Sequence, residues 1–181
     1  MMITTTRLRL TPIREEHADV MQAAAADRDI ADTMISIPHP YPEGEAARWI
    51  ARQQTDRTDG RASTFAIEAL ANDGFCGVIA LRDIDREHEQ AELSFWLARS
   101  AWNQGYMSEV VTATLRYGFE TLGLNRLYAY HMVRNPASGR VLEKNGFTQE
   151  AVLRDRVKKW GVFEDVCLWA MLKRDWVVRA E

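Results

Sequence analysis

The chain has 181 residues, of which 46% are hydrophobic and 27% charged, and it carries a formal net charge of −3. This balance is typical of one globular domain, for which about 150 residues is usual, and it excludes disordered, collagen-like and disulfide-rich proteins. The longest apolar run, residues 166–172, is far shorter than the roughly 20 residues that cross a bilayer, and the scattered arginines form no basic patch for nucleic acid. We therefore expect a single domain over residues 1–181, located in the cytoplasm, with no membrane or nucleic-acid partner.

The first elements in the chain alternate between strand and helix. Residues 7–11 alternate polar and apolar side chains, which predicts a half-buried strand, and residues 15–27 are rich in helix formers. Residues 35–42 (ISIPHPYP) contain three prolines, which remove backbone donors and fix φ. They predict an irregular loop, followed by a helix that has Pro42 near its first turn.

The middle of the chain predicts a β-hairpin. An Asn-Asp-Gly sequence at residues 72–74 separates two strand-like runs, residues 63–70 and 76–84. Asn, Asp and Gly tolerate positive φ, so this sequence between apolar runs is typical of a tight hairpin turn. A further strand is expected over residues 90–98.

A long helix is expected over residues 106–122, because apolar side chains recur there at spacings of three and four, and Gly123 follows as its C-terminal cap. The remaining predicted elements are a strand at 127–133, a helix at 136–144, and two long strands at 147–158 and 162–172. The order indicates a mixed α/β fold with one β-α-β unit in its second half.

The two cysteines, Cys76 and Cys167, both fall within expected strands. Neither has a Cys or His partner at metal-ligand spacing. We interpret each as a small apolar residue, with a reactive thiol or a disulfide as the alternative. The four histidines form no ligand pattern either, so the sequence predicts no metal site.

The segment from Leu93 to Glu109 runs from strand through a glycine-containing loop into a helix. The first amides of a helix have no partner within the helix, and with the positive end of the dipole they favour a bound phosphate. Gly105 allows close approach of the backbone, and Ser108 adds a hydroxyl in the first turn. An ordinary β-α connection is the alternative, because the loop has neither a Walker A sequence nor the three glycines of a dinucleotide fingerprint.

A second segment, residues 135–147 (NPASGRVLEKNGF), repeats the order strand, turn, helix, Gly and Phe. Together the two segments resemble the Gcn5-related N-acetyltransferase (GNAT) superfamily, and most of all its RimJ/RimL-type ribosomal-protein N-acetyltransferases. The opening Thr6–Leu10, the proline-rich loop and residues 154–165 are also similar to that group. The resemblance implies a single GNAT domain whose mostly antiparallel central sheet is splayed at a parallel pair of strands and flanked by helices.

The resemblance also implies an acetyl-CoA site. The superfamily's pyrophosphate loop maps onto residues 102–107, where Trp102 and Met107 depart from the usual polar and small residues, so a side-chain contact from Trp102 is in doubt. Backbone amides make most phosphate contacts, so the departures need not abolish binding. The loop residues assigned to the cofactor are Asn103, Gln104, Gly105, Tyr106, Met107 and Ser108.

The family's pantetheine arm lies against a strand that here includes Phe95, Trp96 and Leu97. For their side chains, core packing is the alternative, and it is compatible with a backbone role. Asn135 and Ser138 fit helix capping on sequence grounds, whereas the resemblance places them against the pantetheine and the sulfur. Many members carry a tyrosine four residues after that serine as general acid, but this chain has Leu142 there. Ser138 is then the nearest candidate donor, with water as the alternative.

Acetyl transfer needs a neutral amine. Near neutral pH, an α-amine with a pKa of about 7.8 is roughly one-third neutral, whereas a lysine at about 10.4 is almost wholly protonated. An α-amine therefore needs only a weak base. Glu92 is our candidate, acting through water at the mouth of the cleft, with a solvated surface glutamate as the alternative. His131 is a second candidate base, for which a structural role is the alternative.

The proline-rich loop and the late strands lie across the cleft from the cofactor in the family's layout. We therefore expect His39, Tyr41 and Trp160 to contact the acceptor, unless the prolines only end one helix and start another. The resemblance implies a direct transfer from acetyl-CoA to a protein or peptide N-terminus. The alternatives are a small amine such as a polyamine, an aminoglycoside or an amino acid derivative, and a non-catalytic acyl-CoA-binding module. A homodimer is left open.

Overall fold

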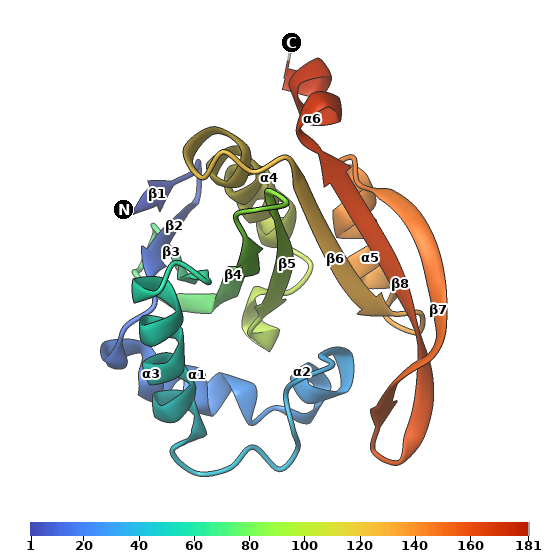
Figure 1. Ribbon diagram of the computed structural model, residues 1–181. Coiled ribbons are helices and arrows are strands. Elements are labelled where there is room, and N and C mark those ends of the chain that lie inside the picture. Colours follow the sequence, from blue (N-terminus) through green and yellow to red (C-terminus); the bar gives the residue numbers. More distant parts are fainter. Residues whose placement is uncertain (181) are drawn as a thin grey trace.

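The computed structural model describes residues 1–180 as one eight-stranded sheet with helices on both faces (Figure 1). The strands follow the order β1-β2-β3-β4-β5-β6-β8-β7 across the sheet. Their bounds are β1 (Ile3–Thr4), β2 (Leu8–Pro12), β3 (Ser63–Ala69), β4 (Phe75–Asp85), β5 (Gln90–Leu97), β6 (Arg126–Met132), β7 (Thr148–Lys159) and β8 (Val162–Leu172).

Every neighbouring pair of strands is antiparallel except β5 and β6, which are parallel. Their pairing covers only the first three residues of β5 and ends at Glu92 opposite Tyr128. Beyond that point the two strands separate, while β5 stays paired with β4 as far as Leu97 and β6 stays paired with β8. The predicted mixed sheet with a splayed parallel pair is thereby confirmed, and the backbone along the second half of β5 has one open edge.

Two helical layers cover the sheet. The helical elements are η1 (Glu15–His17), α1 (Ala18–Ala25), α2 (Arg28–Thr33), α3 (Glu45–Thr58), η2 (Arg99–Ala101), α4 (Tyr106–Arg116), the π-helical turn η3 (Tyr117–Thr121), α5 (Pro136–Lys144) and α6 (Lys173–Ala180). No helix among residues 1–180 is long and apolar enough to cross a membrane.

Each face of the sheet has its own apolar core, because side chains alternate between the two faces of a strand. Ile79 and Leu93 point toward α4 and join the larger core, which includes Val111. Val78 and Trp96 point the other way and join a second core with α1, α2 and α3. The helices that follow β5 and β6 therefore lie on one face, and the N-terminal helices lie on the other.

Most of the predicted elements are confirmed within one or two residues. The hairpin β3-β4 and the long pair β7-β8 form as expected. Both cysteines are buried in strands, and burial raises the pKa of each thiol, in agreement with their interpretation as apolar residues. Four short elements, β1, α2, η2 and α6, were not predicted, because segments of this length carry little periodicity.

Two boundaries differ from the prediction for local reasons. Helix α3 begins at Glu45 rather than near Pro42, because Gly44 adopts a left-handed conformation (φ 68°) directly before it. The helix predicted over 106–122 is α-helical only to Arg116 and continues as the π-helical η3. Gly123 then ends it with φ 71°, as expected of a C-terminal glycine.

Candidate active site

A cleft of about 390 Å³ opens where β5 ends and where helices α4 and α5 begin; we call it the α4–α5 cleft. Ten of the eleven residues that the sequence assigned to the cofactor line it, and Gln104 is the exception. Its further lining residues are Thr33, Met34, Trp102, Ala137, Arg140, Val141 and Lys144. The splayed strands and the glycine loop, which are far apart in the sequence, therefore form one site.

The glycine loop turns into α4 through a left-handed residue. Gly105 has φ 74°, and a Cβ atom placed on it would meet only the Arg7 guanidinium at 3.7 Å. The first α-helical hydrogen bond of this segment runs from the Glu109 amide to the Gly105 carbonyl at 3.3 Å. The amides of Tyr106, Met107 and Ser108 precede it and are free to bind an anion at the positive end of the helix.

Arg7 ties the N-terminal strands to this loop. Its Nη1 donates to the Gln104 carbonyl at 2.9 Å, its Nε donates to Glu109 at 2.7 Å, and its guanidinium lies 4.8 Å from the centre of the Tyr106 ring. Glu109 also accepts from the Thr5 hydroxyl at 2.6 Å. Although burial opposes the effect, these hydrogen bonds hold the pKa of Glu109 below its usual value. The loop is therefore held by three residues, Thr5, Arg7 and Glu109, that do not themselves line the cleft.

Trp102 has a structural contact that the sequence did not reveal. Its indole Nε1 donates to the Leu97 carbonyl at 2.9 Å, and the Arg99 guanidinium lies 5.3 Å from its ring. The side chain of Gln104 turns away, because its Nε2 donates to the Ser100 carbonyl at 2.9 Å. Only the backbone of Gln104 remains for the assigned role.

The end of β5 approaches β4 closely because Gly77 faces it. A Cβ atom on Gly77 would lie 2.2 Å from the Trp96 carbonyl oxygen and 2.8 Å from the Leu97 Cα, and Gly77 has φ 152°. Phe95 and Leu97 are half-buried against the larger core, and Trp96 is buried in the second core. The side chains pack as core residues, and the same three residues also line the cleft.

At the start of α5, Asn135 rather than Ser138 is the capping residue. The Asn135 Oδ1 accepts from the Ser138 amide at 3.4 Å, and its Nδ2 donates to the Ser138 hydroxyl at 3.0 Å and to the Thr33 carbonyl at 3.3 Å. Because the Ser138 oxygen accepts a hydrogen bond there, its own hydroxyl hydrogen is free to point into the cleft. Leu142 is fully buried.

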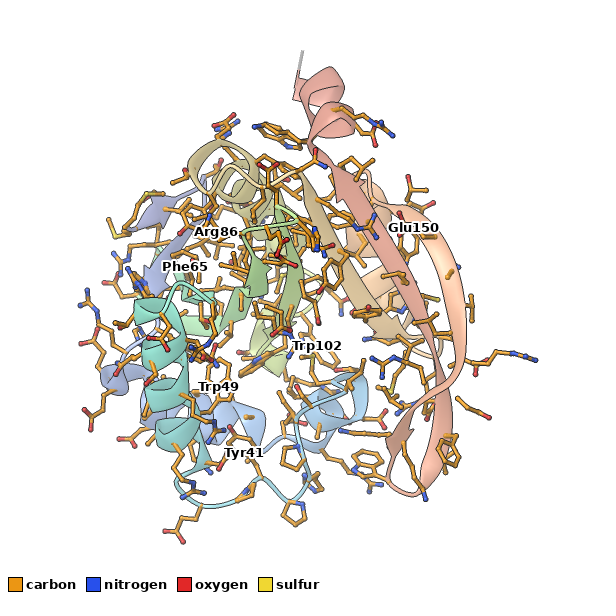
Figure 2. All side chains as sticks on the ribbon, in the orientation of Figure 1. Tyr41, Trp49, Phe65, Arg86, Trp102 and Glu150 are labelled. Atoms are coloured by element: carbon orange, nitrogen blue, oxygen red, sulfur yellow. The ribbon has the colours of Figure 1, made fainter. Side chains whose placement is uncertain are left out.

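A second cleft, of about 610 Å³, lies on the other face of the sheet beside α3, and we call it the α3 cleft. Its floor is formed by β4 and β5, and its walls by α3 and the proline-rich loop. Figure 2 shows Tyr41 and Trp49 by α3 and Trp102 below the end of β5. Met34 and Trp96 line both clefts, so the two meet at the point where β5 and β6 have separated.

The α3 cleft contains equal numbers of acidic and basic side chains, which are Glu45, Asp56 and Asp83 and Arg52, Arg61 and Arg82. Two of these acids are already paired. Glu45 accepts from Arg52 at 2.6 Å and Arg48 at 2.9 Å, which lowers its pKa, and Asp56 accepts from Arg61 at 2.7 Å. The cleft is therefore polar at its rim without an excess of negative charge.

The family model of the acetyltransferase (GNAT) domain matches residues 7–148. The chain belongs to the GNAT acetyltransferases. It is 32% identical over 173 residues to an uncharacterized N-acetyltransferase, p20, of Bacillus licheniformis, which covers 95% of this chain and 96% of that protein. It is accordingly an acetyl-CoA-dependent N-acetyltransferase.

Two solved structures share the fold of this acetyltransferase at low identity. A RimL ribosomal L7/L12 α-N-protein acetyltransferase in complex with coenzyme A has a TM-score of 0.88 and 20% identity, over 95% of this chain and 98% of that chain. The spermidine N-acetyltransferase of Vibrio cholerae in complex with CoA and spermine has a TM-score of 0.84 and 20% identity, over 94% and 98% of the two chains. The fold is thus similar to enzymes of both kinds.

The two candidate bases of the acetyltransferase lie outside both clefts. Glu92 is buried rather than solvated, and its Oε1 accepts from Arg82 Nη2 at 2.6 Å. Arg82 lines the α3 cleft. His131 accepts from the Trp169 indole at Nε2 (2.9 Å), and its Nδ1 lies 2.8 Å from the Met132 carbonyl. Since both ring nitrogens have partners within the protein, His131 is not placed to take a proton from an acceptor.

Of the three predicted acceptor residues, only Tyr41 lines the α3 cleft. His39 is exposed outside it. Trp160 is 45% exposed and lies against the guanidinium of Arg28, 5.4 Å from the ring centre. The late strands approach the site instead through Lys159, which is buried beside the proline-rich loop.

Two basic residues of the α4–α5 cleft, Arg140 and Lys144, were missed in the sequence. They lie four residues apart on α5 and are therefore on one face of that helix. This spacing is visible in the sequence, but basic residues at such a spacing are common on solvated helices. Only their position in the α4–α5 cleft indicates that they could contact phosphates.

Proposed function

We propose that this enzyme transfers the acetyl group of acetyl-CoA to the N-terminal α-amine of a protein or peptide, by direct attack in a ternary complex. The observation that carries the proposal is the meeting of two clefts at Met34 and Trp96. One cleft ends at helix amides suited to phosphates, and the other opens on the opposite face of the sheet. A thioester and an amine that enter from opposite sides come together at that point, and such proximity accounts for a large part of the rate.

We assign acetyl-CoA to the α4–α5 cleft. Its pyrophosphate fits the amides of residues 106–108, and Arg140 and Lys144 supply positive charge for the phosphates on the wall opposite the loop. The open edge of β5 offers backbone groups to the pantetheine arm, because β6 no longer pairs with it beyond Glu92. The residues present therefore fit the cofactor along the length of the cleft, and the whole chain is proposed to act as one domain.

Charge favours a peptide over a polyamine in the α3 cleft. A polyamine carries several positive charges, and its binding requires a surplus of carboxylates to offset their desolvation. Here the acids and guanidiniums that line the cleft are equal in number, and Glu45 and Asp56 are already paired. A peptide brings one amine and a neutral backbone, which this polar but balanced surface accommodates.

Little acid–base assistance is required for an α-amine. At a pKa of about 7.8 a good fraction is already neutral near pH 7. We propose that Glu92, which lies outside the α3 cleft but accepts a hydrogen bond from the cleft residue Arg82, receives the remaining proton through water. Ser138, whose hydroxyl hydrogen is free, is proposed to protonate the departing thiolate.

An assay of CoA release across an acceptor panel tests this function. The panel contains hexapeptides with free serine or alanine N-termini, the same peptides with blocked N-termini and an internal lysine, spermidine, and an aminoglycoside. We expect release with the free N-termini and almost none with the blocked peptides. A kcat/KM for spermidine or the aminoglycoside that exceeds that of every peptide overturns the acceptor class. Calorimetric binding of acetyl-CoA without release from any amine would indicate a non-catalytic binding module.

A further inference from the structure

Lys159, at the end of β7, is a buried cation in an unusual setting. The residue is 7% exposed, whereas its neighbour Trp160 is 45% exposed. Its Nζ donates to the Ile37 carbonyl at 2.6 Å and to the Met34 carbonyl at 2.8 Å, and it forms no ion pair with a carboxylate of residues 1–180. Burial lowers the pKa of the ammonium, against the opposing charge of Asp32. Burial of an amine without an ionic partner costs free energy, which the hydrogen bonds to the two carbonyls must offset.

The two carbonyls lie between α2 and α3: that of Ile37 is in the proline-rich loop, and that of Met34 directly precedes it. Apart from the contact with Lys159, no hydrogen bond within residues 1–180 reaches residues 35–41. The flanking segments are held separately. On one side the Thr33 carbonyl accepts from Asn135 and Asp32 pairs with Arg134, and on the other the Pro42 carbonyl accepts from Gln22. Lys159 is thus the hydrogen-bond anchor for the middle of the loop.

That part of the loop forms a wall of the α3 cleft. Ser36, Ile37 and Tyr41 line the cleft, and Met34 lies at the junction of the two clefts. The anchor itself comes from the β7-β8 hairpin, which belongs to the half of the sheet on the far side of the splay (Figure 1). Lys159 therefore links the proline-rich loop, which lies on the β1–β5 side of the splay, to strand β7 on the other side. This link lies directly beside the junction of the two clefts.

We propose that Lys159 is a positioning residue for the acceptor, which sets the shape of the α3 cleft by holding the Met34 and Ile37 carbonyls. The inference rests on the proposed function only in assigning the acceptor to that cleft. The α4–α5 cleft keeps its own supports, through Arg7, Trp102 and Asn135. Loss of the lysine should therefore affect the acceptor far more than acetyl-CoA.

The test compares Lys159→Met with Lys158→Met. Lys158 is the adjacent residue, but it is exposed and its Nζ lies against the Phe163 ring at 5.2 Å. For the free-amine peptides, we expect Lys159→Met to raise the acceptor KM by about tenfold, because small displacements of a positioning wall are costly. The calorimetric Kd of acetyl-CoA should stay within about twofold of the parent, and Lys158→Met should leave both quantities unchanged. Should Lys159→Met fail to fold, Lys159→Gln is measured in its place; its N–H donor stands on a shorter side chain, so we expect a smaller rise in the acceptor KM, again with an unchanged Kd of acetyl-CoA.

Amide hydrogen exchange provides a readout that needs no acceptor. In the Lys159 variant, exchange should accelerate at the amides of Met34 and Glu45, which donate to the Ile30 and Pro42 carbonyls at the two ends of the loop. It should remain unchanged at the amides of Trp102 and Glu109, which donate to the Arg99 and Gly105 carbonyls at the α4–α5 cleft. If no amine is acetylated by the parent enzyme, the proposed function fails, while this pattern still tests the anchor. A lower melting temperature with an unchanged acceptor KM, an equal rise in KM and in the acetyl-CoA Kd, or unchanged exchange at the amides of Met34 and Glu45 would each overturn the inference.

Discussion

Gly105 and Gly123 adopt nearly the same backbone conformation at the two ends of one helical segment. Their φ angles are 74° and 71°, and a Cβ at either position meets little, with no atom within 4 Å at Gly123. Any other residue is therefore strained to a similar degree at both positions. Only Gly105 borders the α4–α5 cleft. A substitution at Gly123 therefore shows the effect of backbone strain alone, whereas one at Gly105 adds any effect on ligand binding.

We expect Gly105→Asp to raise the Kd of acetyl-CoA by at least about tenfold, or about 1.4 kcal/mol. An aspartate is tolerated before the first turn of a helix, but its negative charge would occupy the anion site. Gly123→Asp serves as the control and should change the Kd by less than about twofold. Calorimetry on both folded variants measures the difference. Equal affinities of the two variants for acetyl-CoA would show that the pyrophosphate does not bind at the α4 amides.

The two possible roles of Ser138, helix capping and proton donation, can be distinguished by substitution. Because Asn135 accepts from the Ser138 amide, the stability cost of about 1 kcal/mol expected for a lost cap belongs to Asn135→Ala. Ser138→Ala should instead lower kcat by about a hundredfold, the low end for general acids, since a thiol with a pKa of about 8.5 already leaves readily. Measurement of kcat and of the unfolding midpoint on both variants checks this. If kcat of Ser138→Ala remains within about twofold of the parent, water or the bare thiolate is the better explanation.

At the scale of elements, the N-terminal strands support the glycine loop across a long separation in sequence. Arg7 and Arg9 stand two residues apart, but Arg9 pairs with Glu68 at 3.0 Å and with Asp73 at 2.8 Å, away from the loop. Arg7 instead holds the Gln104 carbonyl and Glu109. Arg7 therefore supports the glycine loop, and Arg9 serves as a control for it.

We expect Arg7→Met to weaken acetyl-CoA binding by about fivefold, because a half-exposed ion pair with hydrogen bonds contributes at most about 1 kcal/mol. Arg9→Met should leave the affinity within about twofold of the parent. Acetyl-CoA titrations of both variants measure the effect, and the melting temperature reports any general loss of stability. Similar affinities in the two variants would show that the loop holds its shape without Arg7.

Local sequence was sufficient for the elements whose conformation depends on neighbouring residues. The Asn-Asp-Gly turn, the glycine before α4 and the Asn-Pro start of α5 all fix φ or cap a helix within a few residues. The cofactor residues were assigned through the resemblance to the GNAT superfamily, and ten of the eleven line one cleft. By contrast, His39 and Trp160 lie outside the α3 cleft, because loop and hairpin orientation depends on distant contacts such as that of Lys159.

At the scale of the whole molecule, His131 links stability to pH. It is buried between β6, β8 and α5, accepts from Trp169, and lies 3.0 Å from a Cβ placed on Gly139. Burial lowers its pKa from the ordinary 6.5. In the pH range between its folded and unfolded pKa values, the unfolded chain binds more protons than the folded one. The free energy of unfolding must therefore fall as pH decreases below about 6.5.

We expect His131→Gln to reduce this pH dependence, because the amide oxygen can still accept from Trp169 but does not titrate. Urea unfolding at pH 7.5 and pH 5.5 should show a larger loss of stability in the parent, by up to about 1.4 kcal/mol for each pH unit. His88→Gln, at an exposed position, should retain the parent's dependence. An identical loss in the parent and in His131→Gln would show that other groups control acid stability.

The sequence by itself indicated an acetyltransferase through the resemblance of its motifs to the GNAT superfamily. Its local patterns determined a mixed α/β fold, which residues start α4 and α5, and that a glycine there leaves amides free for an anion. These properties follow from backbone conformation and hydrogen bonding over a few residues. The resemblance also implied that the parallel strands diverge, but only the tertiary structure decided that their pairing ends at Glu92, and that Met34 and Trp96 join two clefts of opposite faces. The same holds for Arg7 at Gln104 and Lys159 at Met34 and Ile37, contacts that span about half the chain or more. Such contacts depend on strand register and on the packing of whole layers, which no local pattern in the sequence specifies.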